Sequence, residues 1–211
     1  MMEPSYKRIK SEGSAETVVK KSRFIAYASV VFDELSAKDF IDLIKERHKD
    51  ASHNTYAYIV GKATKTERYS DDGEPGGTAG IPILNKIQQY GLTDTIVVVT
   101  RYFGGTLLGT GGLARAYSGS AEEVIHKCGT AGFIEGYLVS VEIEYHFHGK
   151  VSNYIRNRAF GVIDEIFTDR VIIKTLIPVD EYSRTVDDIN ELTGAASKVE
   201  LISEQFIEME S

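Results

Sequence analysis

Two glycine-rich segments, Arg68–Gly80 and Arg101–Gly112, hold most of the residues that could carry chemistry. Ten of the 19 glycines lie between Gly73 and Gly112, interleaved with arginine, acidic and aromatic residues. Because glycine loses much conformational entropy on folding, this clustering indicates shaped loops whose backbone approaches something closely. We expect a ligand-binding surface formed by these residues: Arg68, Ser70, Asp71, Asp72, Glu74, Thr78, Arg101, Tyr102, Phe103, Gly104, Gly105, Gly111, Gly112 and Arg115.

The chemistry expected of this surface is anion binding. Each segment leads into a predicted helix, so free backbone N–H groups would lie at the positive end of a helix dipole. The three arginines could add forked, positively charged donors for a phosphate or carboxylate. A second interpretation stays open, in which the arginines pair with Asp71, Asp72 and Glu74 and only shape the loops.

The same acidic residues raise the question of a metal. Carboxylates at this spacing could hold Mg²⁺ or Ca²⁺, but they do not match a calcium-binding EF-hand loop, and turn or capping roles account for them equally well. Neither segment ends in Gly-Lys-Ser/Thr, which argues against a P-loop. Residues 109–114 have the letters of a dinucleotide fingerprint but do not directly follow their strand. We therefore expect no metal and no cofactor.

Other candidates for catalysis are weaker. His53 precedes a strand and could lie near the loops, but a histidine without an identified partner is more often structural. His146 and His148 fall on the polar face of a predicted strand. Cys128 sits at a helix end with no evident base beside it, and no serine occupies a Gly-x-Ser-x-Gly elbow. No catalytic residue is assigned.

Charge is distributed unevenly along the chain. Residues 1–134 carry 17 Lys and Arg against 16 Asp and Glu, whereas residues 135–211 carry 7 against 15. Since nucleic-acid affinity comes largely from phosphate neutralisation, the second part is a poor candidate for binding RNA. The single cysteine, the lack of an apolar N-terminal segment and the short aliphatic runs favour a cytoplasmic protein that does not enter the membrane.

Periodicity predicts an α+β protein. In the N-terminal part we predict a helix opening at Ser36 with Asp39 completing a capping box, and a strand buried on both faces at Thr95–Thr100. The remaining predicted elements are strands at 16–19, 24–32 and 55–60 and helices at 82–89 and 112–127.

The C-terminal part predicts a ferredoxin-like domain. A long alternating strand runs through 137–148, and the order of elements after it is β-α-β-β-α-β. Gly129, Gly132 and Gly136 mark a hinge-like stretch, so we place one domain at residues 1–132 and the other at 136–211.

Both loops resemble the IMPACT family, in its bacterial YigZ type. The first motif is Arg68-x-Ser-Asp-Asp-Gly-Glu-Pro-x-Gly-Thr-Ala-Gly-x-Pro82, and the second is Arg101-Tyr-Phe-Gly-Gly-x-x-Leu-Gly-x-Gly-Gly-Leu-x-Arg-Ala-Tyr117. The resemblance implies a split β-α-β N-terminal domain, similar to a ribosomal protein and to a translation factor, followed by a ferredoxin-like domain. It also implies translational control, the role of the eukaryotic relatives.

We therefore expect a non-enzymatic regulator linked to translation or stress, which binds RNA, the ribosome or a protein partner through the two loops. The alternative is an enzyme or binder acting on a phosphorylated small molecule at the helix N-termini. In a third interpretation, the loops only pack the two domains together.

Overall fold

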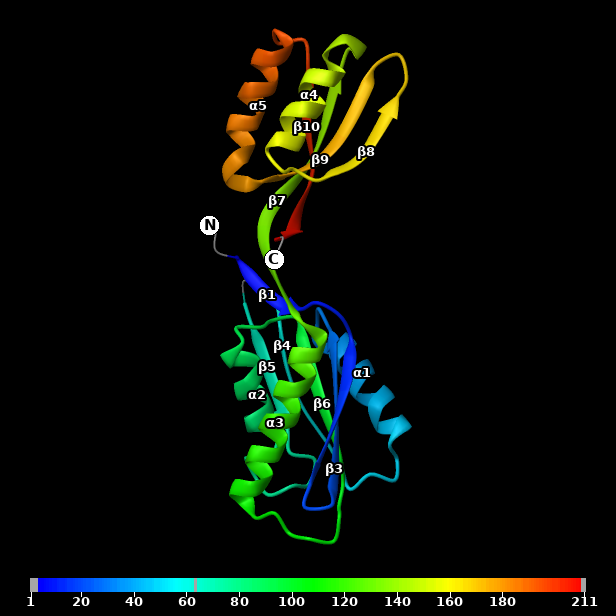
Figure 1. Ribbon diagram of the computed structural model, residues 1–211, viewed down its shortest axis with the longest axis vertical. Helices are drawn as coiled ribbons and strands as arrows, with labels where there is room; N and C mark the ends of the chain where they lie inside the picture. Colours follow the sequence, from blue (N-terminus) through cyan, green and yellow to red (C-terminus); the bar gives the residue numbers. More distant parts are fainter. Residues whose placement is uncertain (1–3, 63, 210–211) are drawn as a thin grey trace. The chain divides into compact units, whose positions relative to one another are not determined.

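The computed structural model describes residues 4–62 and 64–209. It divides into two compact units, Tyr6–Gly132 and a second unit formed mainly by Phe133–Ser211 (Figure 1). We call these the N-terminal unit and the C-terminal unit. Both combine helices with an antiparallel sheet, as expected of an α+β protein.

A five-stranded sheet forms the middle of the N-terminal unit. Its strands, in spatial order, are β2 (Gly13–Val19), β3 (Ser22–Val30), β6 (Thr95–Tyr102), β4 (His53–Val60) and β5 (Thr66–Ser70). Strands β3 and β4 both pair antiparallel with β6, so they run parallel to each other, and α1 (Glu34–Arg47) connects them. Because β6 is inserted between the two parallel strands, this is the split β-α-β arrangement that the resemblance implied.

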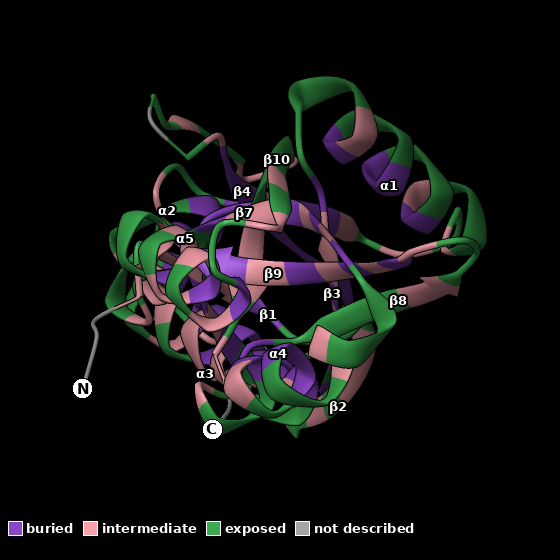
Figure 2. Ribbon diagram, turned by 90° about the horizontal axis from the view of Figure 1, so that it is seen from above, coloured by how far each residue is buried: buried purple, intermediate pink, exposed green. Residues whose placement is uncertain are grey.

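Helices cover both faces of this sheet. Ile96 and Val98 of β6 pack with the apolar side of α1, while Val97 and Val99 pack with α2 (Gly80–Gln89) and α3 (Thr110–Cys128). The buried stripe of α1 faces the sheet, and its other side is exposed (Figure 2). The uninterrupted apolar run of β6 is therefore explained by burial on both faces, as predicted.

The first helix begins earlier than the predicted Ser36. Asp33 is the N-cap, its carboxylate accepts from the Ser36 backbone N–H at 2.7 Å, and the Ser36 hydroxyl completes the capping box. Ser36 thus occupies the third helical position rather than the first. The capping box is formed by Asp33 and Ser36, not by Ser36 and Asp39, so the prediction placed it three residues too late. Both residue types are favoured at helix N-termini, which is why the sequence allowed either pair.

Two strands were not predicted. β1 (Tyr6–Ile9) lies near the start of the described chain, and β5 includes Arg68–Ser70, which we expected to belong to the first loop. Among the strands that the structure describes, β5 lies at the sheet edge and pairs with β4 alone. Its side chains are largely exposed and polar, so it lacks the apolar alternation by which strands are recognised.

The C-terminal unit has the predicted ferredoxin-like topology. Its elements follow the order β-α-β-β-α-β: β7 (Thr130–Ile143), α4 (Tyr145–Asn157), β8 (Val162–Phe167), β9 (Val171–Pro178), α5 (Val179–Thr193) and β10 (Lys198–Glu208). The strands pair in the order β10-β7-β9-β8. Alternate residues of β7 and β9, such as Val141 and Ile173, form a core with Val151 and Ile189 of the two helices.

Two details of this unit differ from prediction. His146 and His148 lie in the first turns of α4, not on a strand, because β7 ends at Ile143. The apolar residues beyond that point contact the core at helical spacing, which overrides the apparent alternation. Gly132 and Gly136, expected in a hinge-like stretch, lie within β7. No helix in the described part of the chain is long and apolar enough to cross a membrane.

Candidate functional site

The two glycine-rich segments converge on one cleft of about 450 Å³ in the N-terminal unit. We call it the loop cleft. It is bounded by the start of β4, the loop before α2, the end of β6 with the loop that follows it, and the first turn of α3. The lining residues are His53, Gly73, Glu74, Pro75, Arg101, Phe103, Leu107, Leu108, Gly109, Thr110 and Leu113.

A buried ion pair lies at one wall of the loop cleft. Arg101 Nη1 donates to Glu74 Oε1 at 2.6 Å, and the Tyr117 hydroxyl of α3 donates to the same oxygen at 2.6 Å. Burial, followed by the adjacent Glu74 carboxylate, raises the pKa of Tyr117, so this side chain acts as a neutral donor. One carboxylate therefore ties the first loop, β6 and α3 together.

Arg101 is only 6% exposed. Its guanidinium carbon lies 5.5 Å from the ring centroids of both Phe24 and Phe103, and Nη2 donates to the Ser22 hydroxyl. These contacts offset part of the cost of burying the charge, while the buried Nε atom has no hydrogen-bond partner among the described residues. Arg101 therefore pairs internally with an acidic neighbour, as in the second interpretation. Its charged donors do not point outward to a ligand.

The N-terminus of α2 is already filled by the protein itself. Asp71 accepts from the backbone N–H groups of Gly77 at 2.7 Å, Ala79 at 3.0 Å and Gly80 at 2.8 Å. Burial opposes ionisation of Asp71, but these three donors outweigh it and lower the pKa of the carboxyl. The expectation of free amides at both helices is thus wrong for α2, because an internal carboxylate occupies them.

The three acidic residues of the first loop point to different partners. Asp72 accepts hydrogen bonds from the Lys45 ammonium at 3.1 Å and from the Asn54 backbone N–H at 2.6 Å. Asp71 caps α2, and Glu74 pairs with Arg101. Among the residues that the structure describes, no group of three or more metal-binding side chains gathers anywhere.

The N-terminus of α3 differs from that of α2. Its N-cap is Gly109, which has no side chain that could cap the first turn. Within residues 4–62 and 64–209, no acceptor contacts the backbone N–H groups of Thr110, Gly111 or Gly112. This helix has 19 residues, and its first turn borders the loop cleft. Of the two helices, α3 is therefore the one whose N-terminus has the open backbone N–H groups that the sequence predicted.

The other expected residues have mainly structural roles or lie away from the loop cleft. Arg68 lies on the edge strand near Glu34, the Tyr102 hydroxyl contacts His48 and Asp50, and the hydroxyl of buried Thr78 donates to the Pro75 carbonyl. Ser70 accepts from the Asp72 backbone N–H.

Gly104 and Gly105 shape the second loop. A β-carbon at Gly104 would lie 2.0 Å from the Lys21 backbone, so only glycine fits there. Gly105 has a φ of +78°, in the left-handed region that favours glycine. Both glycines therefore serve the loop's conformation.

Several residues of this region were missed in the sequence. Pro75, Leu107, Leu108 and Leu113 form an apolar part of the loop cleft, and Leu107 is 83% exposed. The sequence did contain a signal for them, the adjacent pair Leu107 and Leu108 inside a polar, glycine-rich segment. A loop does not need two leucines for its own packing, so such a pair indicates an exposed apolar surface.

A second hollow of about 260 Å³ adjoins the cleft, and both are lined by Leu108. Lys20 and Arg115 line this hollow, are exposed, and have no ion-pair partner among the described residues. We call it the basic hollow. Of the three arginines singled out in the sequence, Arg115 is thus the one left available to an external anion.

His53 is better oriented than the sequence indicated. Its Nδ1 lies 2.8 Å from the Asp72 carbonyl oxygen, which can only accept, so Nδ1 carries a proton. Nε2 lies 3.9 Å from Glu74 Oε1, and the side chain lines the loop cleft. The ring is held in place with its second nitrogen near the cleft.

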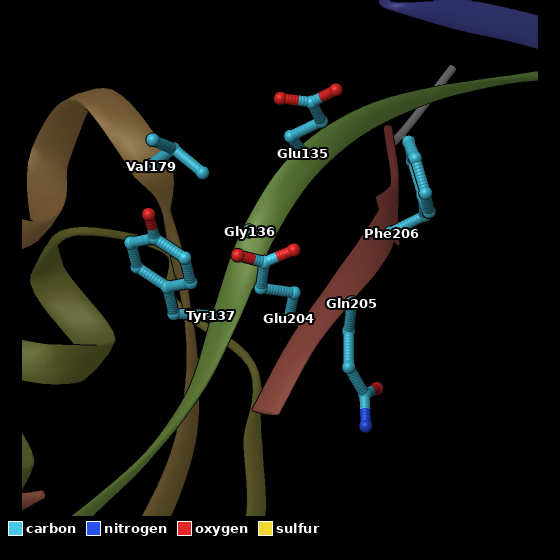
Figure 3. A pocket seen from close by; sticks show the side chains of 7 residues that line it. All are labelled: Glu135, Gly136, Tyr137, Val179, Glu204, Gln205 and Phe206. Carbon is cyan, nitrogen blue, oxygen red and sulfur yellow. The ribbon is translucent and has the colours of Figure 1, made fainter. Parts of the chain in front are cut away.

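The C-terminal unit has a hollow of its own, of about 340 Å³ (Figure 3). Glu135 of β7 and Glu204 of β10 line it, beside Tyr137 and Phe206. Two carboxylates on neighbouring strands would repel a phosphate group. This hollow therefore offers no support for RNA binding by the C-terminal unit.

Sequence comparison places the chain among known proteins. The profile of the Impact N-terminal domain matches residues 20–125, and a domain of unknown function, DUF1949, matches residues 141–196. IMPACT family member YvyE of Bacillus subtilis is 37% identical over 195 residues, which cover 92% of this chain and 90% of the relative. The chain belongs to the IMPACT family.

Further relatives agree with this assignment. IMPACT family member YigZ of Escherichia coli is 31% identical over 177 residues, covering 82% of this chain and 87% of that protein. A crystal structure described as that of a hypothetical protein matches with a TM-score of 0.62 and 26% identity, over 96% of this chain and 99% of the other. The resemblance inferred from the two loop motifs is confirmed.

Proposed function

We propose that this IMPACT family protein is a non-enzymatic regulator linked to translation or stress, which binds RNA, the ribosome or a protein partner through the loop cleft. The observation that carries the proposal is the convergence of both family motifs on a cleft with an exposed apolar wall. Exposed apolar surface next to polar groups is typical of a binding site for another macromolecule. The translational role comes from the implied function of the eukaryotic relatives.

The charged groups of the cleft support binding over catalysis. Glu74 and Arg101 are paired with each other and buried, so neither is poised to transfer a proton to a ligand or to stabilise a developing charge. Their arrangement is that of a frame, which contacts Phe103 and binds Tyr117 of α3 beside the cleft.

A cell-free translation assay tests the proposal. Adding the purified protein to a bacterial translation extract is expected to change the yield of a reporter by at least about twofold. The double variant F103S/L107S should remove this effect, because it replaces two large exposed apolar residues of the cleft and leaves the buried pair in place. The control is Leu35→Ser, which alters an exposed leucine of α1. A double variant as active as the unaltered protein would contradict a role for the cleft.

A second candidate, binding of a phosphorylated small molecule, is favoured by the open amides of α3 together with the oriented His53. A thermal-shift screen with nucleotides and sugar phosphates distinguishes the two. A ligand at about one hundred times its dissociation constant adds roughly 2.7 kcal/mol to the free energy of unfolding. A clear rise in melting temperature that Gly112→Pro removes would favour this candidate, whereas an unchanged melting temperature throughout would count against it.

A further inference from the structure

The loop cleft and the basic hollow together indicate the chemistry of the partner. We propose that they bind a segment of a partner protein in which a bulky aliphatic side chain stands next to an acidic residue. This inference deepens the proposed function and depends on it, because it names the class of partner that the loop cleft takes. The proposed partner is a protein segment, and the experiment below distinguishes it from RNA.

The apolar wall favours an aliphatic side chain. Leu107, Leu108, Leu113 and Pro75 supply most of it, and burying a leucine-sized side chain against them would remove apolar surface from water, which favours binding. Two aromatic rings line the loop cleft in the described part of the chain, Phe103 and His53. The Arg101 guanidinium already lies 5.5 Å from the Phe103 centroid, and the His53 ring is held by the Asp72 carbonyl beside Glu74. The loop cleft therefore offers few ring faces on which the bases of single-stranded RNA could stack.

The charges favour an acidic neighbour beside that aliphatic residue. Lys20 and Arg115 in the basic hollow have no ion-pair partner among the described residues. The carboxylates closest to the loop cleft are already committed, Glu74 to Arg101 and Asp71 to the amides of α2. The unbalanced charge of this surface is thus positive, which is complementary to a carboxylate on the partner.

The protein contains its own example of the proposed contact. Asp71 delivers a carboxylate to the N-terminus of α2 and accepts three backbone hydrogen bonds there. No residue of the described chain does the same for α3, although its first turn lies between the loop cleft and the basic hollow. A partner's aspartate or glutamate would supply from outside the cap that Asp71 supplies from within.

Leu108 sets the spacing of the partner's two side chains. It lines both the loop cleft and the basic hollow, so the apolar and charged subsites share one wall. An aliphatic side chain in the cleft and a carboxylate over Gly112 and Arg115 must therefore come from adjacent or nearly adjacent residues of the partner. A short linear segment is sufficient to meet this requirement.

Nuclear magnetic resonance titration of the full chain, labelled with nitrogen-15, tests the inference with four probes. The first is the blocked peptide acetyl-Gly-Leu-Glu-Leu-Gly-amide, and two matched peptides carry Gln for Glu or Ser for both Leu. The fourth is an eight-nucleotide oligouridylate. We expect the first peptide to shift the amide signals of residues 109–112 and to bind about tenfold more tightly than either matched peptide, a difference of about 1.4 kcal/mol.

Variants sharpen the result. Leu107→Ser and Arg115→Ala are each expected to weaken the first peptide about five- to tenfold. Their matched controls, Leu35→Ser and Lys65→Ala, alter an exposed leucine and an exposed lysine elsewhere and should leave affinity unchanged. Equal binding of the three peptides, shifts confined to other regions, or no peptide binding overturns the inference.

The two proposals fail separately. Oligouridylate that shifts residues 109–112 while no peptide does so removes the protein segment but keeps a macromolecular partner at the loop cleft. The broader proposal fails in the translation assay, if F103S/L107S acts like the unaltered protein there.

Discussion

Replacing Arg101 with methionine is expected to lower the free energy of unfolding by about 3–5 kcal/mol. The substitution keeps much of the side-chain volume but leaves Glu74, which is 7% exposed, buried without its cation. The contacts with Phe24 and Phe103 lose their electrostatic component at the same time. Urea denaturation at pH 7, followed by circular dichroism, measures the change.

Two further variants separate the buried pair from a general effect of arginine loss. Arg115→Met removes an exposed arginine that has no ion-pair partner in the described chain, and should change stability by no more than about 0.5 kcal/mol. The double variant R101M/E74Q should be more stable than R101M, because a neutral amide oxygen can still accept from Tyr117. Equal losses for R101M and Arg115→Met would show that Arg101 does not hold the loops together.

Replacing Asp71 with alanine is expected to lower the free energy of unfolding by about 2–4 kcal/mol. Two of its three donors, the backbone N–H groups of Ala79 and Gly80, belong to buried residues and would be left without an acceptor. The third, from Gly77, is partly exposed and contributes less. Asp42→Ala is the matched control, because the contact of Asp42 in the described chain is an exposed one with Lys38, and its loss should cost little.

The stability difference between the unaltered protein and Asp71→Ala should depend on pH. The pKa of Asp71 is lowered in the folded state, so unfolding is accompanied by proton uptake at low pH. The stabilisation is fully present above the pKa of an unfolded aspartate, about 3.9, and is lost as the pH falls through the lower folded value. Urea denaturation at pH 7, 5, 4 and 3 measures this difference, and a difference that grows toward acid pH would contradict the capping role.

The two substitutions act on different parts of the candidate site. Arg101→Met disturbs the frame of the loop cleft itself, whereas Asp71→Ala disturbs the start of α2. Neither residue is placed to contact the proposed partner segment through its charged group. Loss of peptide binding in either variant would therefore follow from a displaced loop, and exposed residues such as Leu107 and Arg115 remain the direct test of recognition.

Local patterns were sufficient to predict most of the elements. The apolar run of β6 predicted burial on both faces, and the alternation in β7 with the later helices predicted the ferredoxin-like unit. These signals depend on the period of side chains along one segment, which is set by the backbone geometry of helices and strands. The edge strand β5 escaped because its exposed side chains leave no such period.

The roles of the charged residues were beyond any local pattern. The amino-acid types and spacings marked both loops as a shared surface, and placed arginines and acids within it. Glu74 and Arg101 are 27 positions apart, and whether they face each other or a ligand depends on which of them folding buries. Burial makes an unpaired charge costly, so buried Arg101 is paired with Glu74, and Asp71 accepts from the backbone N–H groups at the start of α2. Arg115 and the first turn of α3 are open to solvent.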